Sequence, residues 1–178
     1  MIAHVAGPMF GDNCRAEPFE KKHRTELKAA CAEDRDIWAM YATSFAPDRF
    51  DASLDATLAN PLNRLFVLFD GETVAGMSAY LGVFEARETL EIGCTYYRPA
   101  LRGTGFNRRV KDMMLERAFA SGFRRVIFCV DIRNARSQAA MKKLGAVREG
   151  VLRADRITWT GHIRDTVLFA ILKDEWPV

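Results

Sequence analysis

Two stretches of this sequence hold the residues best suited to chemistry. The first is RPALRGTGFNRR, residues 98–109, which places two glycines and four arginines between a predicted strand and a predicted helix. A glycine-rich turn that enters a helix presents backbone N–H groups outward, and the helix dipole adds partial positive charge behind them. The stretch therefore predicts a binding site for an anion such as a phosphate.

The second stretch is LEIGCTYY, residues 90–97, a predicted strand that contains Glu91. Strand alternation is expected to place Glu91 and Thr95 on one face and Ile92 and Cys94 on the other. A Glu91 carboxylate that faces a crevice could accept a proton, and partial burial would raise its pKa toward the pH at which the reaction takes place. An ion pair with a nearby arginine is an equally good explanation for a glutamate at position 91.

Hydrophobic periodicity indicates which elements position these stretches. Asp70-Gly71 between two apolar runs predicts a hairpin, which leads into a strand over 88–97. A helix that starts at Phe106 and ends at Ser121-Gly122 then connects to the apolar strand 124–132, which we expect to be buried on both faces. A strand, helix and strand in this order imply parallel pairing of the two strands.

The predicted fold class is α+β, with a mixed sheet that is antiparallel at both ends and parallel at one central junction. Parallel strands that diverge leave a crevice at their carboxyl ends, where an open sheet binds its ligand. The crevice is therefore the expected place for the ligand. The other predicted elements are a strand over 13–18, one or two helices within 20–41, a helix that follows a Ser53 cap, a helix over 134–146, and strands over 147–156 and 163–172.

Composition limits the functions to consider. The chain has 178 residues, 49% apolar and 28% charged, which predicts one globular domain over 1–178 with a flexible segment at 1–12. A net charge of +3 is small for a nucleic-acid-binding protein but suits a small anionic ligand. The four cysteines lack metal-ligand spacing, so no metal is expected. Neither a signal peptide nor a membrane span is recognisable, which predicts a cytoplasmic protein.

The glycine turn fits several ligand classes when it is taken alone. A P-loop is excluded because no G-K-[ST] follows. A dinucleotide-binding turn is compatible with Gly103-x-Gly105 and with Asp131 at the end of the next strand, but Arg108 occupies the third glycine position. A plain tight turn with no ligand is the remaining interpretation.

The order of the motifs resembles the GNAT superfamily of acyl-CoA-dependent N-acetyltransferases, and within it the RimJ/RimL-like branch. The resemblance rests on EIGCTYYRPALRGTGFNRRVKDMMLERAF, RVIFCVDIRNARSQAAMKKLGAVREGVLR and RDTVLFAILKDEW, and extends over most of residues 13–176. It implies a centrally splayed mixed sheet flanked by helices. It also implies transfer of an acetyl group from acetyl-CoA to a primary amine, on a protein N-terminus or a small molecule, by direct attack in a ternary complex.

The resemblance also implies roles for individual residues. The family's Q/R-x-x-G-x-G/A turn aligns on residues 100–105, where Ala100 replaces the usual polar residue. Glu91 would act as the base through a water molecule, with a backbone N–H from 95–97 as oxyanion donor. Ser137 would lie near the thioester sulfur or the cofactor phosphates. The residues implied to bind the cofactor are Tyr96, Tyr97, Arg102, Gly103, Thr104, Gly105, Phe106, Asn107, Asn134 and Ser137.

Two alternatives stay open at this stage. Asn134 and Ser137 also fit a simple helix N-cap, which needs no ligand. Met141 stands where many family members have a tyrosine that protonates the leaving thiolate, so Ser137, Tyr96 or Tyr97 would have to act instead, or the thiolate leaves with little assistance. Met141 at this position is also compatible with a non-catalytic acyl-CoA-binding sensor. A homodimer through an outer strand is compatible with the sequence.

Overall fold

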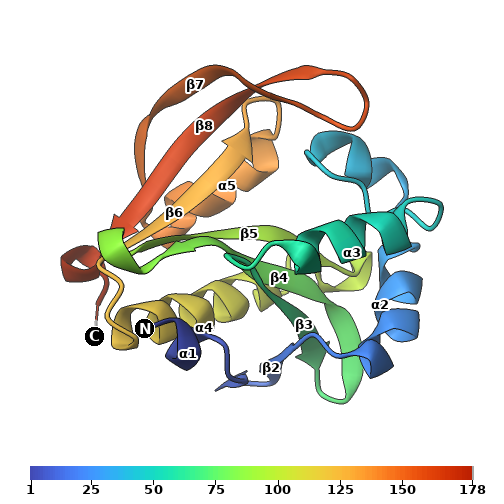
Figure 1. Cartoon of the computed structure of the whole chain (residues 1–178), viewed down its shortest axis with the longest axis horizontal. Helices are drawn as coiled ribbons and strands as arrows, with labels where there is room; N and C mark the ends of the chain where they lie inside the picture. Colours follow the sequence, from blue (N-terminus) through green and yellow to red (C-terminus); the bar gives the residue numbers. More distant parts are fainter. Residues whose placement is uncertain (178) are drawn as a thin grey trace.

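The computed structural model describes residues 1–177, which form an eight-stranded mixed sheet with helices on both faces (Figure 1). The strands follow the order β1-β2-β3-β4-β5-β6-β8-β7. This arrangement confirms the predicted α+β fold class. The strands are β1 (Met9–Gly11), β2 (Cys14–Pro18), β3 (Arg64–Asp70), β4 (Thr73–Phe84), β5 (Thr89–Tyr97), β6 (Arg125–Asp131), β7 (Val147–Ile157) and β8 (Ile163–Leu172). The α-helices are α1 (Ile2–Val5), α2 (Arg24–Cys31), α3 (Phe50–Ala59), α4 (Phe106–Ala120) and α5 (Ala135–Leu144), and the 3₁₀ helices are η1 (Lys21–His23), η2 (Asp36–Met40), η3 (Glu85–Arg87), η4 (Pro99–Leu101) and η5 (Lys173–Glu175).

The parallel junction between β5 and β6 is short. Only three residue pairs are in register, and the last of them joins Glu91 to Ile127. Beyond this pair the two strands separate, and β6 continues its pairing with β8 alone. The crossover between β5 and β6 is α4, as the sequence predicted. The sheet is therefore splayed at its centre, directly after Glu91.

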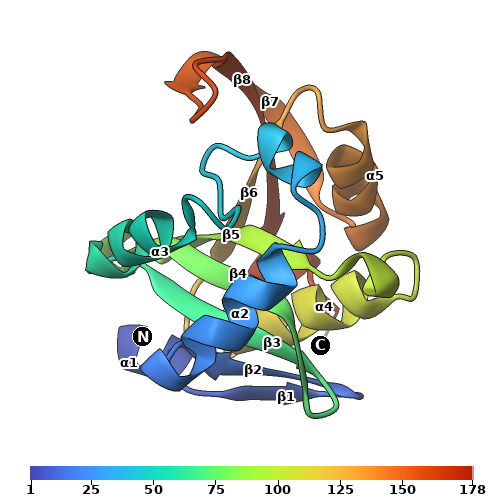
Figure 2. The same cartoon turned by 90° about the vertical axis from the view of Figure 1, so that its right-hand side faces the viewer.

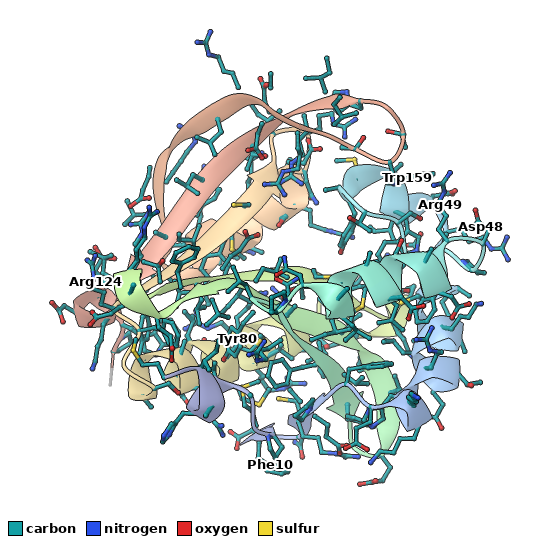
Figure 3. The ribbon with its side chains drawn as sticks, viewed as in Figure 1. Phe10, Asp48, Arg49, Tyr80, Arg124 and Trp159 are labelled. Atoms are coloured by element: carbon teal, nitrogen blue, oxygen red, sulfur yellow. The ribbon has the colours of Figure 1, made fainter. Side chains whose placement is uncertain are left out.

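The two faces of the sheet pack against different helices. Figure 2 shows α2 and α3 on one face and α4 on the other. Strand alternation in β3 sends Phe66 and Leu68 into the core formed with α4 and α5, and Leu65 and Val67 into the core formed with α2 and α3. Tyr80, labelled in Figure 3, is fully buried in the α4 core, where its hydroxyl donates a hydrogen bond of 2.7 Å to the Met114 carbonyl.

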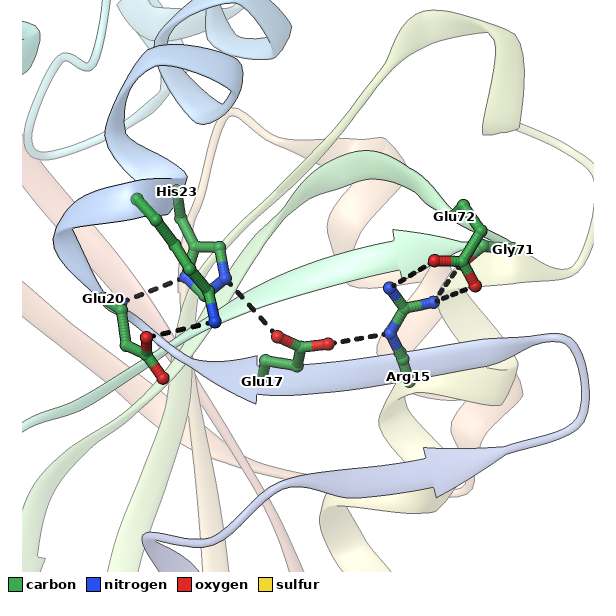
Figure 4. A network of polar contacts seen from close by, with 7 residues as sticks. Arg15, Glu17, Glu20, His23, Gly71 and Glu72 are labelled. Atoms are coloured by element: carbon green, nitrogen blue, oxygen red, sulfur yellow. Dashed lines mark hydrogen bonds and ion pairs between the residues drawn. The ribbon is translucent and has the colours of Figure 1, made fainter.

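A polar network fastens the start of the chain to the central hairpin (Figure 4). The Arg15 guanidinium donates to the Gly71 carbonyl in the β3–β4 turn and forms an ion pair with Glu17 at 2.9 Å. The Glu17 carboxylate also lies 3.4 Å from the His23 ring at the start of α2. Exposed ion pairs contribute little to stability individually, so the network chiefly fixes the relative position of β2, α2 and the hairpin.

The sequence predicted a flexible segment at residues 1–12. In the structure this segment contains α1 and β1, and Val5 and Met9 are buried in the α4 core. Arg117 on α4 donates hydrogen bonds to the His4 and Pro8 carbonyls. The segment is short and carries little periodicity, and its order depends on these contacts with α4.

Two further expectations need correction. Helix α3 begins at Phe50, so Ser53 lies within the helix, where its hydroxyl donates to the Ser44 carbonyl at 2.7 Å. Strand β6 is not buried on both faces: Val126 and Phe128 are buried, whereas Ile127 and Cys129 on the opposite face are half-buried. On this second face Cys129 lines a cavity.

Candidate active site

The opening between β5 and β6 holds a cavity of about 360 Å³. It is lined by Arg102 and Asn107 from the glycine turn and the start of α4, and by Asn134 from the start of α5. Tyr41 and Leu81, which pack against the core formed with α2 and α3, line it as well. Glu91 also lines it. One cavity therefore joins the predicted anion-binding turn to the predicted base.

A β-bulge shapes the wall of this cavity. Ala79 pairs with Gly93 but Met77 pairs with Tyr96, so β5 contains one extra residue, and Cys94 has a φ of +52°. The bulge reverses the alternation: Cys94 packs against the α2 and α3 core, and Thr95 faces α4. The prediction that Thr95 shares a face with Glu91 was therefore wrong, because alternation assumes a regular strand.

Glu91 is half-buried beside the point where β5 and β6 separate. Gly93 gives its carboxylate room, because a Cβ at Gly93 would lie 2.8 Å from the Glu91 Oε1 atom. Burial raises the pKa of Glu91, and this effect is opposed by the nearby Cys129 thiol and the cations Arg156, Arg164 and Lys111. A carboxylate with a raised pKa in a cavity has the properties of a general base.

Lys111 is the functional candidate that sequence reasoning missed. Its side chain is 3% exposed, reaches the cavity from α4, and donates a hydrogen bond of 2.6 Å to the Thr95 hydroxyl. Burial lowers the pKa of Lys111 to about 7, against the opposing effect of Glu91. The signal in the sequence was its spacing, because Leu115 and Ala118 lie four and seven residues later and are buried on the same side of α4.

The glycine turn has the geometry of an anion cradle. Gly103 and Gly105 have φ values of +81° and +83°, which residues with a Cβ rarely adopt. The backbone N–H groups of Gly103, Gly105, Asn107 and Arg108 have no acceptor among residues 1–177. A Cβ at Gly103 would meet no atom within 4 Å, so the space beside it is open. Four free donors at the start of α4 fit a pyrophosphate.

The arginines near this turn differ in their contacts, and Arg102, which the sequence predicted to bind the cofactor, is paired within the protein. Arg102 forms an ion pair of 2.5 Å with Asp34, so its charge is already compensated within the protein. Arg136 lines the cavity from the first turn of α5 and makes no ion pair among the described residues. Sequence reasoning overlooked Arg136, although its place beside the Asn134 cap indicates a cation at a helix N-terminus.

The start of α5 combines a structural cap with cavity-lining groups. The Asn134 side-chain oxygen accepts a hydrogen bond of 2.9 Å from the Ser137 backbone N–H, which confirms the N-cap interpretation. Both residues also line the cavity. The cap uses the side-chain oxygen of Asn134 and the backbone of Ser137, which leaves the Asn134 amide and the Ser137 hydroxyl for a ligand.

The two tyrosines of β5 have different surroundings. Tyr96 is 1% exposed, stacks on Trp38, and donates from its hydroxyl to the Ala30 carbonyl at 2.8 Å. A role for the Tyr96 hydroxyl as an acid is therefore contradicted, because the bulge turns this side chain into the α2 and α3 core. Tyr96, Tyr97 and Met141 all line the cavity. The Tyr96 hydroxyl is bound to the Ala30 carbonyl, whereas that of Tyr97 has no hydrogen-bond partner among residues 1–177.

The β7–β8 connection packs against the segment around η2. The Trp159 indole donates to the Trp38 carbonyl at 2.8 Å, and the Trp159 backbone N–H donates to the Ala42 carbonyl at 3.1 Å. The Arg49 guanidinium lies 5.0 Å from the centre of the Trp159 ring. Figure 3 shows both residues at the edge of the molecule.

Comparison with known proteins identifies the family. Residues 15–147 match the model of the acetyltransferase (GNAT) domain. The chain belongs to the GNAT family. A comparison with curated proteins finds no match. The GNAT fold uses acetyl-CoA as its acyl donor, and the chain is an acyltransferase.

Solved structures of GNAT proteins agree with this fold. A structure from T. thermophilus, assigned as an acetyltransferase, is 33% identical, with a TM-score of 0.87 over 96% of this chain and 91% of the other. Ribosomal-protein-S5-alanine acetyltransferase from Vibrio fischeri is 18% identical, with a TM-score of 0.74 over 96% and 99% of the two chains. Spermidine N-acetyltransferase from Vibrio cholerae, solved with CoA and spermine, is 17% identical, with a TM-score of 0.74 over 92% and 97%. The last two support the fold alone.

The GNAT assignment agrees with the remaining observations on the chain. The splayed mixed sheet is that of its structural neighbours. Among residues 1–177, none of the helices has the length and apolar character that crossing a bilayer requires.

Proposed function

We propose that this protein is an acetyl-CoA-dependent N-acetyltransferase of the RimJ/RimL-like branch, acting on a primary amine. The observation that carries the proposal is the continuous cavity between β5 and β6, which joins Arg102 and Asn107 at the glycine turn to the half-buried Glu91 carboxylate. A donor held at one end and an acceptor entering at the other would meet beside Glu91. Direct transfer between them needs no covalent enzyme intermediate.

The residues proposed to hold acetyl-CoA lie at the start of two helices. When bound, this molecule supplies an acetyl thioester as the acyl donor. The free N–H groups between Gly103 and Arg108 would bind its pyrophosphate, with Arg136 adding charge from α5. Asn134 and Tyr97 would line the path toward Glu91. Thr104 and Phe106 support the turn, because the Thr104 hydroxyl accepts a hydrogen bond from the Phe106 N–H at 3.4 Å.

Glu91 is proposed as the general base. An ammonium group cannot attack a thioester, so the acceptor must lose a proton, and the Glu91 carboxylate faces the cavity where this would happen. Its raised pKa makes it a stronger proton acceptor than an exposed glutamate. The bulge at Cys94 interrupts pairing between β4 and β5, and a backbone N–H of residues 95–97 would act as the oxyanion donor.

Protonation of the leaving thiolate would fall to a group that lines the same cavity. Of the hydroxyls predicted from the sequence, those of Ser137 and Tyr97 belong to cavity-lining residues and make no hydrogen bond among residues 1–177, and the Lys111 ammonium is a third proton donor. Met141 cannot serve, since a thioether carries no proton. A thiol with a pKa near 8.5 is also a tolerable leaving group without an acid.

The test combines binding with turnover. Isothermal titration should detect acetyl-CoA binding, and a thiol-release assay with a panel of amines and peptides should detect acetyl transfer, with products identified by mass. Absence of binding at millimolar acetyl-CoA would overturn the proposal. Binding without transfer to any acceptor would favour the non-catalytic acyl-CoA-binding sensor instead. A cytoplasmic location and a homodimer stay predictions of the sequence.

A further inference from the structure

Two arginines face each other at the acceptor end of the cavity. Arg156 on β7 and Arg164 on β8 are direct partners across the antiparallel pair. A bulge between Leu152 and Arg156 sets this register, and Ala154 within it has a φ of +50° and donates to the Asp165 carboxylate at 2.8 Å. Both arginines line the cavity. Like charges directly opposite each other on a sheet are destabilising, so an anion bound between the two guanidinium groups would stabilise the pair.

Carboxylates of the protein compensate these two charges only in part. Asp131, Asp155 and Glu91 act on the pair electrostatically, but Arg164 forms no ion pair among residues 1–177. Arg156 is paired with Asp155 at 2.6 Å and stays 42% exposed. Arg164 is only 5% exposed, and its single hydrogen bond among residues 1–177 runs from Nη2 to the Cys129 carbonyl at 3.0 Å. The Arg164 Nε atom is buried without a partner. A buried guanidinium whose Nε atom lacks an acceptor is costly unless a ligand accepts a hydrogen bond from it.

The pair lies on the acceptor side of the sheet. Alternation along β8 sends Val167 and Phe169 into the core with α4 and α5, so Arg164 points to the opposite face. The helix N-termini proposed to hold acetyl-CoA belong to α4 and α5. Arg164 and Arg156 are also close enough to Glu91 to oppose the rise in its pKa. These arginines are therefore neighbours of the proposed base and stand apart from the phosphate cradle.

We propose that the acceptor is an amine that carries a carboxylate, and that Arg156 and Arg164 bind this carboxylate while the amine lies at Glu91. This inference rests on the proposed acetyl transfer. Guanidinium groups bind carboxylates through paired, charge-assisted hydrogen bonds, which would also orient the amine. The uncharged part of the acceptor would contact Leu81, which also lines the cavity. A polyamine would be repelled by the two arginines.

The experiment compares matched acceptors. Free amino acids, their carboxamides and the corresponding decarboxylated amines are assayed with saturating acetyl-CoA, and the ratio of kcat/KM for each acid over its amide is measured. We expect a ratio of at least about tenfold, because a site built for charged groups discriminates strongly against analogues that lack them. Acetylation of amides or polyamines as fast as acids would overturn the carboxylate inference and leave acetyl transfer intact.

Variants connect the preference to the arginines. Arg164→Gln and Arg156→Gln should lower the acid-to-amide ratio toward one, with little change in the KM for acetyl-CoA. Arg156→Gln provides a second measurement if Arg164→Gln folds poorly, because Arg156 is more exposed than Arg164. Arg153→Gln is the matched control, because Arg153 is an exposed residue of β7 that does not line the cavity. A ratio that stays high in both cavity variants would also overturn the inference.

A binding measurement keeps the inference testable without turnover. The CoA-loaded protein is heated with each acceptor of the panel, and unfolding is followed by differential scanning fluorimetry. The acids should raise the Tm more than their amides in the wild type, and Arg164→Gln should remove the difference. Equal shifts for acids and amides would overturn the carboxylate site. Failure of CoA itself to raise the Tm would count against the proposed cofactor.

Discussion

Lys111 on α4 donates a hydrogen bond of 2.6 Å to the Thr95 hydroxyl on β5, at the place where β5 and β6 have separated. Thr95 is held further by Ser78, whose hydroxyl lies 2.7 Å away, and by Tyr41, which donates to the Thr95 carbonyl at 2.6 Å. Among residues 1–177, Lys111 is the only buried cation of α4. These contacts fix it beside the bulge, where it acts electrostatically on Glu91.

Replacing Lys111 should change the pH dependence of activity. The positive charge of Lys111 lowers the pKa of Glu91 and partly offsets the effect of burial. Lys111→Met removes this charge, so the acidic limb of the kcat/KM profile should move to higher pH. The measurement is kcat/KM between about pH 5 and 9. Lys142→Met, at an exposed position of α5, should leave the profile in place. Identical profiles for all three proteins would show that Lys111 and Glu91 are not coupled.

The same substitution should change how stability depends on pH. Folding lowers the pKa of Lys111 from 10.5 to about 7, so between these values the unfolded chain binds a proton that the folded chain lacks. The wild type should therefore gain stability relative to Lys111→Met as pH rises through this window, by at most about 1.4 kcal/mol per pH unit. Urea unfolding at three pH values measures the difference. A constant difference would mean that Lys111 keeps its ordinary pKa in the folded protein.

Gly103→Ala should weaken binding of acetyl-CoA. Both the φ of +81° and the open space beside Gly103 would be disturbed by a Cβ, and we expect roughly a tenfold increase in the acetyl-CoA KM. Gly71→Ala is the control, since Gly71 has a φ of +58° in the β3–β4 turn, outside the cavity. Both variants should lose about 1–2 kcal/mol of stability. An equal rise in KM for both would attribute the effect to stability alone.

Glu91→Gln should reduce turnover and leave cofactor affinity nearly intact. Removal of a general base costs about 10²- to 10⁴-fold in rate, and the amide fits the space above Gly93 as well as the carboxylate does. The measurements are kcat with a competent acceptor and the Kd for acetyl-CoA by titration. Glu26→Gln, an exposed change on α2, should behave like the wild type. Unchanged turnover in Glu91→Gln would remove Glu91 as the base.

The sequence was most informative where local chemistry decides structure. Asp70-Gly71 specified the hairpin, and Ser121-Gly122 ended α4 because Gly122 adopts a φ of +95°. Gly145 ended α5 in the same way, with a φ of +93°. These positions depend on backbone conformations that glycine adopts readily, so a single residue type predicts them.

The side chains of the site were harder to predict, because their positions depend on tertiary contacts. The bulge at Cys94 places a non-glycine residue at positive φ, and no local pattern indicates it. It placed the Tyr96 hydroxyl in the core formed with α2 and α3, and Thr95 next to Lys111. Arg164 became a candidate only through its partner across β7 and β8 and its burial beside Cys129. Sequence spacing within one element contains no information on such pairs.

The strand order has a consequence for how the chain acquires its site during synthesis. β8 follows β7 along the chain but lies between β6 and β7, so β7 touches the sheet only through β8. Arg156 on β7 is synthesised before β8, the strand that pairs with it. β8 also supplies Val167 and Phe169 to the core formed with α4 and α5, so this core is completed only when the last strand has been made. The wall that contains Arg156 and Arg164 depends on the same strand.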